Sequence, residues 1–182
     1  MKKILIAVIT TFLLNLSSEQ GNITKLNGID IWWESHGDIN NPTALLIMGL
    51  NSNSKVWSDQ YIENLVVNNL HVLVFDNRDI GKSTWITEEP GLITFIKYLP
   101  NFLQVYFVEF IFGFIFDEEG KFNMENPAPA EYNLSDMAMD GIALLDHLEI
   151  SEAHIIGASM GGMIAQVMAL EHSDRVKSLT LF

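Results

Sequence analysis

Residues 153–162 read Ala-His-Ile-Ile-Gly-Ala-Ser-Met-Gly-Gly. Within them, 157–161 form the pattern Gly-x-Ser-x-Gly, between an apolar run that predicts a buried strand and a stretch that predicts a helix. A side chain on so sharp a turn sits in strained backbone, which is tolerated where the residues two positions away lack a Cβ. Gly157 and Gly161 meet that need. We therefore expect Ser159 above the carboxyl end of a sheet, as a candidate nucleophile.

The chain on either side of this turn alternates between strand and helix patterns. Continuous apolar runs predict strands covered on both faces, and Asn27-Gly28 predicts the turn of a hairpin. The expected strands are 23–26, 29–35, 44–48, 71–75, 153–156 and 176–182. The expected helices are 57–67, 134–148 and 163–170. This alternation indicates an α/β fold with a doubly wound, mostly parallel sheet.

Two backbone amides are candidates to stabilise negative charge beside Ser159, because a developing oxyanion needs two donors. One is the amide of Met160, at the start of a helix whose positive dipole end would point to the same place. The other is the amide of Leu50, in the loop after the expected strand 44–48. Gly49 in that loop allows the two segments to approach closely.

Three motifs in this order resemble the α/β-hydrolase superfamily: Met-Gly at 48–49, Phe-Asp-Asn-Arg-Asp-Ile-Gly-Lys-Ser at 75–83, and Gly-Ala-Ser-Met-Gly-Gly at 157–162. Within it, the chain resembles serine esterases of the aclacinomycin methylesterase group, over residues 25–88 and 132–182. The resemblance implies a Ser-His-Asp triad and hydrolysis of small-molecule carboxylic esters through an acyl-enzyme, with no cofactor. The methionine at position 48 departs from the histidine that such enzymes often carry there, but it leaves the backbone donor intact.

Other ionisable residues are expected to be structural. By family position, Asp76 and Arg78 would brace the loop after the strand 71–75 rather than take part in chemistry. The five histidines lie on expected helices, at strand starts, or at a strand end away from Ser159, so none is a good triad base: His36, His71, His147, His154 and His172. Metal-ligand spacings and a phosphate-binding glycine loop are absent from the sequence, so no metal is expected.

In the resembling enzymes the triad runs serine, acid, histidine along the chain. Only 23 residues follow Ser159, so we expect the acid and the histidine beyond Phe182, with about 80–120 residues lacking from a complete domain. We expect the chain as given to be inactive by itself, to fold poorly and to expose the strand 176–182 as an edge. The alternatives are a non-catalytic binding protein on the same scaffold and an inactive truncated product.

The first 18 residues have the layout of a secretory signal peptide. Lys2 and Lys3 precede the apolar run 4–14, and Ser17 and Ser18 follow it. This predicts an exported protein, secreted or periplasmic, whose folded domain is 19–182. Loss of the two lysines would change the formal net charge from −13 to −15. A buried N-terminal element and an uncleaved membrane anchor are the alternatives.

The stretch 91–116 interrupts the strand–helix alternation because it is strongly apolar and aromatic. Pro100 divides it into two short helical pieces, and its charged residues argue against a membrane span. We expect 91–130 to be a cap or lid over an apolar substrate pocket. Additional core and a surface helix that touches lipid are the alternatives.

Composition narrows the possible partners. The length of 182 residues fits one domain, and 48% apolar with 18% charged residues is enough for a hydrophobic core. A formal net charge of −13 argues against binding nucleic acid and disfavours anionic membrane surfaces. The chain has no cysteine, so disulfides and thiol chemistry are excluded.

Overall fold

The computed structural model describes residues 21–87 and 130–182. The chain divides into two compact units, residues 1–84 with 133–182 and residues 85–132. Every helix and strand described below belongs to the first unit. The expected signal peptide and residues 91–129 of the expected cap lie outside the described residues.

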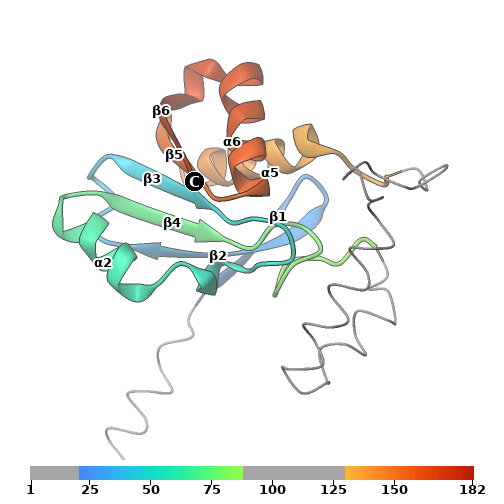
Figure 1. The fold of residues 1–182 in the computed structure, drawn as a ribbon, viewed down its shortest axis with the longest axis horizontal. Helices are drawn as coiled ribbons and strands as arrows, with labels where there is room; N and C mark the ends of the chain where they lie inside the picture. Colours follow the sequence, from blue (N-terminus) through green and yellow to red (C-terminus); the bar gives the residue numbers. More distant parts are fainter. Residues whose placement is uncertain (1–20, 88–129) are drawn as a thin grey trace, which may run out of the picture. The chain divides into compact units, whose positions relative to one another are not determined.

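Six strands form one sheet in the order β1-β2-β4-β3-β5-β6 (Figure 1). The β1 and β2 strands pair antiparallel as a hairpin, β2 pairs antiparallel with β4, and the remaining neighbours are parallel. The predicted α/β class with a doubly wound, mostly parallel sheet is confirmed. The strands are β1 (Asn22–Leu26), β2 (Ile29–His36), β3 (Thr43–Ile47), β4 (His71–Phe75), β5 (Ala153–Gly157) and β6 (Val176–Leu181).

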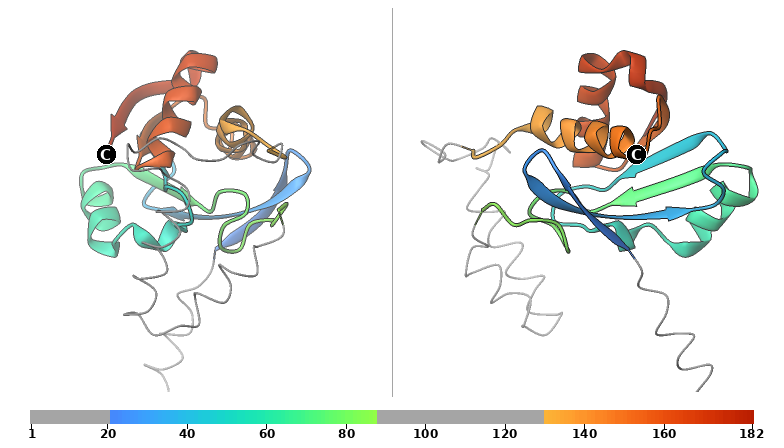
Figure 2. Two further views of the ribbon diagram at one scale, coloured as in Figure 1. Left: turned by 45° about the vertical axis from the view of Figure 1, so that its right-hand side comes forward. Right: turned by 180° about the vertical axis from the view of Figure 1, so that it is seen from behind.

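Helices cover both faces of this sheet. Figures 1 and 2 show α2 (Asp59–Val67) on one face and both α5 (Leu134–His147) and α6 (Met160–Glu171) on the other. Two short 3₁₀ turns, η1 (Ser54–Val56) and η2 (Ser173–Arg175), precede α2 and β6. No helix among these described segments combines the length and apolar character needed to cross a membrane.

The core lies in two layers because successive strand residues point to opposite faces. One layer lies between α2 and the sheet: Ile62 of α2 packs with the strand residues Ala44, Leu46, Val72, Val74 and Ile156. On the other face, a Cβ added to Gly141 of α5 would lie 3.3 Å from Met168 of α6 and 3.4 Å from Leu45 of β3. The absence of a side chain at 141 thus lets the two helices and the sheet pack closely.

Capping residues decide where the helices begin. The predicted helix 57–67 begins at Asp59, because the Ser58 side chain accepts a hydrogen bond from the Tyr61 amide and caps it. A capping box between Asn133 and Asp136 starts α5 where the sequence predicted it. The helical pattern 163–170 covered only part of α6, which begins at Met160, directly after Ser159, where the positive end of a helix was expected.

The strand β6 lies at the edge of the described sheet. It pairs with β5 along one side, and its residues 177–181 are exposed. Leu179, Leu181 and the following Phe182 present large apolar side chains to solvent. The exposed edge predicted for 176–182 is present in the structure.

Candidate active site

The backbone at Ser159 is strained. Its φ of 54° and ψ of −123° fall where side-chain-bearing residues rarely lie. The residue stands between the end of β5 and the first residue of α6, and it is exposed. Its hydroxyl makes no hydrogen bond to any described residue. The predicted sharp strand-to-helix turn is therefore present, with an accessible hydroxyl at its apex.

Two glycines make this bend possible, and each does so through a different neighbour. A Cβ on Gly157 would collide with the carbonyl of Gly161. A Cβ on Gly161 would collide with the carbonyl of Ile47, at the end of β3. The first contact is local to the turn, as expected, whereas the second brings α6 against a strand distant in sequence.

Backbone hydrogen bonds hold the bend in place. The Ala158 amide donates to the Ile47 carbonyl at 3.0 Å, and the Ser159 amide donates to the Phe182 carbonyl at 3.0 Å. The Gly162 amide donates to the Ser159 carbonyl at 2.8 Å. The bend is thus anchored to the last residue of β3 and to the residue that follows β6, and the amide of Ser159 is itself engaged.

The loop after β3 lies against Ser159. A Cβ built on Gly49 would lie 2.9 Å from the Cβ of Ser159 and 3.3 Å from its Oγ. The neighbouring Leu50 amide and the Met160 amide donate no hydrogen bond to any described residue. The structure therefore brings the two segments that carry the expected oxyanion donors together at the carboxyl edge of the sheet.

A residue that sequence reasoning missed supports this loop. The Asn77 side chain is buried, and its Nδ2 donates to the Met48 carbonyl at 2.9 Å. Its position in the motif at 75–83 was visible, but nothing in the local pattern indicated that its side chain points inward to another loop.

Asp76 joins two loops through hydrogen bonds to its carboxylate. Its carboxylate accepts hydrogen bonds from the Ser54 amide and hydroxyl at 2.9 and 2.8 Å, and from the Lys82 amide at 3.0 Å. These contacts tie the turn after β4 to η1. The carboxylate is buried among these donors, and we therefore infer that it stabilises the two loops.

Arg78 pairs with a carboxylate on a distant helix. Its Nε and Nη2 atoms each donate to Asp140 of α5 at 2.8 Å, in bidentate geometry. Both side chains are buried, and Asn27 of the β1–β2 turn also donates to Asp140 at 3.2 Å. Sequence reasoning missed Asp140; its signal was an acidic residue at a buried position of an amphipathic helix.

The five histidines lie away from Ser159, as expected. His71 begins β4, at the opposite edge of the sheet, where its ring lies between the Ser35 and Thr43 hydroxyls at 2.8 and 3.0 Å. Burial lowers the pKa of His71, and the charge of Asp38 opposes this shift. In the described part of the chain, no group of three or more histidine and acidic residues could hold a metal ion.

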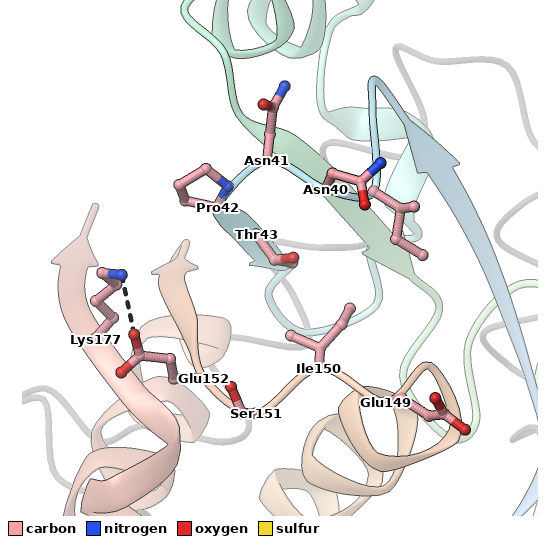
Figure 3. Close-up of a pocket in the computed structure, with 10 residues that line it drawn as sticks. Asn40, Asn41, Pro42, Thr43, Glu149, Ile150, Ser151, Glu152 and Lys177 are labelled. Atoms are coloured by element: carbon pink, nitrogen blue, oxygen red, sulfur yellow. Dashed lines mark hydrogen bonds and ion pairs between the residues drawn. The ribbon is translucent and has the colours of Figure 1, made fainter.

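A polar hollow of about 320 Å³ lies at the amino ends of the strands. Figure 3 shows Thr43 of β3, Glu149 and Ser151 among the residues that line it, together with the ion pair of Glu152 with Lys177. This is the edge opposite Ser159, so the hollow is separate from the candidate active site.

A mostly parallel sheet with helices on both faces, and a serine on a strained bend at its carboxyl edge, is the arrangement of an α/β hydrolase. A sequence model of the family described as the alpha/beta hydrolase fold matches residues 42–182, and the chain belongs to that family.

Comparison with individual proteins agrees with this family. The chain is 27% identical over 153 residues to rhodomycin D methylesterase DnrP of Streptomyces peucetius, covering 84% of this chain and 38% of that protein. A solved hydrolase from Pseudomonas aeruginosa PA01 has a TM-score of 0.62 at 21% identity, covering 91% and 46%. Epoxide hydrolase A from Mycobacterium thermoresistibile has a TM-score of 0.62 at 20% identity, covering 89% and 38%. The chain thus spans less than half the length of these relatives, and the two structures show likeness of fold.

Proposed function

We propose that the full-length protein is a serine hydrolase of small-molecule carboxylic esters that acts through an acyl-enzyme on Ser159. The observation that carries the proposal is the exposed Ser159 on a strained bend, with Gly49 against its side chain and the first residue of α6 next in the chain. This geometry leaves the hydroxyl open to a substrate carbonyl and places backbone amides nearby. The likeness to a methylesterase supports the ester as substrate class.

In the proposed reaction, Ser159 Oγ bonds to the ester carbonyl carbon and gives up its proton to a histidine. The Leu50 and Met160 amides stabilise the oxyanion. When the carbonyl re-forms, the alcohol leaves with the proton from the histidine, and water then hydrolyses the acyl-enzyme by the same steps. Because none of the five histidines lies near Ser159, the proposal requires a histidine from outside residues 1–182, and the triad order of the resembling enzymes implies an orienting acid there too.

The nucleophile distinguishes this chemistry from that of some structural relatives. Enzymes of this fold that open epoxides use an aspartate on the same bend, whereas this chain carries a serine at 159. A neutral hydroxyl must be activated by a base before it attacks, which suits acyl transfer. We therefore favour ester hydrolysis over epoxide opening for this chain, although its fold resembles that of an epoxide hydrolase.

The test compares Ser159→Ala with Ser151→Ala in the full-length protein. Ser151 is exposed at the opposite edge of the sheet, so its loss should leave hydrolysis of p-nitrophenyl esters unchanged. Ser159→Ala should reduce the rate by at least about 10³-fold and abolish labelling by a fluorophosphonate, which reacts with activated serines. Unchanged hydrolysis would refute the proposal, and a parent protein that resists labelling would favour a non-catalytic binding protein.

Two further proposals rest on sequence alone. The apolar segment 91–116 favours an apolar acyl or alcohol group, so its replacement by a polar segment should change chain-length preference among p-nitrophenyl esters; an unchanged preference would remove this support.

The pattern at residues 2–18 favours export of the protein through a signal peptide. N-terminal sequencing of the exported protein should begin near residue 19, and recovery of Met1 would contradict this.

A further inference from the structure

Asn77 lies at the junction of two loops that leave the sheet at its carboxyl edge. It is the second residue after β4, and its carbonyl accepts a hydrogen bond from the Ile80 amide at 3.1 Å, which closes a turn. The first residue of such a turn commonly faces solvent, yet Asn77 is only 2% exposed. Its side chain points inward, where Nδ2 donates to the Met48 carbonyl at 2.9 Å.

This hydrogen bond controls the orientation of a peptide group. Because the peptide bond is planar, fixing the Met48 carbonyl also fixes the amide of Gly49. The preceding carbonyl, that of Ile47, is already held by the Ala158 amide at 3.0 Å. Two successive carbonyls at the end of β3 are therefore fixed, one by the bend that carries Ser159 and the other by Asn77.

The fixed peptide determines where the loop goes next. Gly49 lies against the Ser159 side chain, at 3.3 Å from Oγ for an added Cβ. The Gly49 carbonyl accepts a hydrogen bond from the Ser52 amide at 3.3 Å, so the Leu50 amide in the same peptide points the other way. A rotation of the Met48–Gly49 peptide would move the Leu50 amide relative to Ser159.

The side chain is directed at this one carbonyl. Asn77 Oδ1 is buried and has no hydrogen-bond partner among the described residues, so the Met48 bond is the contact that its amide makes there. If the side chain only filled space, an apolar residue would be more stable here, because burial of an amide whose oxygen has no hydrogen-bond partner is unfavourable. The donor at Nδ2 is therefore the feature that distinguishes asparagine from an apolar residue at this position.

We propose that Asn77 is a positioning residue for ester hydrolysis: its Nδ2 holds the Met48–Gly49 peptide so that the Leu50 amide faces the developing oxyanion. The inference rests on the proposed function of Ser159. Asn77 does not touch the substrate. Its effect is therefore expected on the transition state, in which the oxyanion forms, and not on binding of the ester.

The test uses Asn77→Asp and Asn77→Leu in the full-length protein, since both keep the approximate size and remove the donor. The matched control is Asn68→Asp, because Asn68 is exposed at the end of α2 and its Nδ2 likewise donates to a backbone carbonyl, that of Asn64, at 2.7 Å. We expect kcat for p-nitrophenyl butyrate to fall about 10- to 100-fold in both Asn77 variants, with KM within about twofold. The control should match the parent protein.

A second readout separates positioning from a general structural role. A trifluoromethyl ketone forms a tetrahedral oxyanion on the serine, so its inhibition constant should rise by the same factor as kcat falls. A folded Asn77 variant with the parent kcat, a loss expressed in KM alone, or failure of both variants to fold would overturn the inference. Failure of the proposed function is distinguishable, because Ser159→Ala would then retain activity.

Discussion

At the scale of single residues, the proposed chemistry depends on one unfavourable backbone conformation. Ser159 has a φ of 54°, a conformation that costs about 1–3 kcal/mol for a residue with a side chain. Packing of the bend against the end of β3 and the hydrogen bond to Phe182 offset this cost. The bend therefore persists because the packed backbone around it holds this conformation. At positions 157 and 161 that backbone leaves no room for a Cβ, so both residues are glycine.

Gly161→Ala should destabilise the protein by about 2–3 kcal/mol and reduce ester hydrolysis at least about tenfold, because its methyl group would collide with the Ile47 carbonyl. The measurement is thermal unfolding together with kcat. Gly162→Ala is the matched control, since its Cβ would lie 3.4 Å from the nearest atom, the Gly157 carbonyl oxygen. If the two substitutions behaved alike, the proposed steric role of position 161 would be wrong.

At the scale of secondary-structure elements, buried polar contacts join the loops to the helices. The bidentate pair of Arg78 with Asp140 connects the turn after β4 to the middle of α5, and Asn27 connects the same carboxylate to the β1–β2 hairpin. Asp76 connects the turn after β4 to η1. These contacts fix how α5 and the hairpin lie on the sheet, while the loops at the carboxyl edge remain available for the site.

Asp140→Ala should lower the free energy of unfolding by about 3–5 kcal/mol, because it leaves the buried Arg78 guanidinium without this carboxylate. Denaturant unfolding measures the change. Asp146→Ala on the same helix is the control: its ion pair with Arg175 at 2.7 Å involves a carboxylate that is 61% exposed, so its loss should matter by less than about 1 kcal/mol. Equal changes in the free energy of unfolding would show that burial does not determine how much each ion pair contributes to stability.

At the scale of the whole molecule, we expect stability to depend on pH through a buried histidine at the opposite edge of the sheet. Burial holds the pKa of His71 below its ordinary value of 6.5. The unfolded chain therefore binds a proton more readily than the folded protein. The contribution of His71 to the free energy of unfolding should therefore be fully present above pH 6.5 and should decrease as the pH falls below that value, until the lowered pKa of the folded state is reached.

His71→Gln should flatten this part of the stability profile, because glutamine does not titrate but can still hydrogen-bond to Ser35 and Thr43. Urea unfolding at several pH values below 7 would measure the slope in both proteins. The pKa of the exposed Asp38 is also lowered, through hydrogen bonds from Asn40, so its contribution is lost at lower pH, below its ordinary value of 3.8. An unchanged slope between pH 6.5 and 4 in the variant would contradict the assignment to His71.

The sequence by itself determined the features that depend on neighbouring residues. The continuous apolar runs at β3, β4 and β5 predicted buried strands, Asn27-Gly28 predicted the hairpin, and Gly-x-Ser-x-Gly predicted the strained bend at Ser159. Periodicity and local sterics act over a few residues, so they can be read from the chain directly. The helical pattern itself was recognised only from residue 163 because Gly161 and Gly162 are poor helix formers, and packing against β3 overrides that preference.

Only the tertiary structure decided which distant residues meet. Asn77 reaches Met48, and Arg78 reaches Asp140. Each of these contacts depends on the strand order β1-β2-β4-β3-β5-β6 and on the distance that each loop spans at the edge of the sheet. A local pattern carries no information about such distances, because long-range contacts are set by the way crossovers and packed layers place whole elements, and not by the residues within one element.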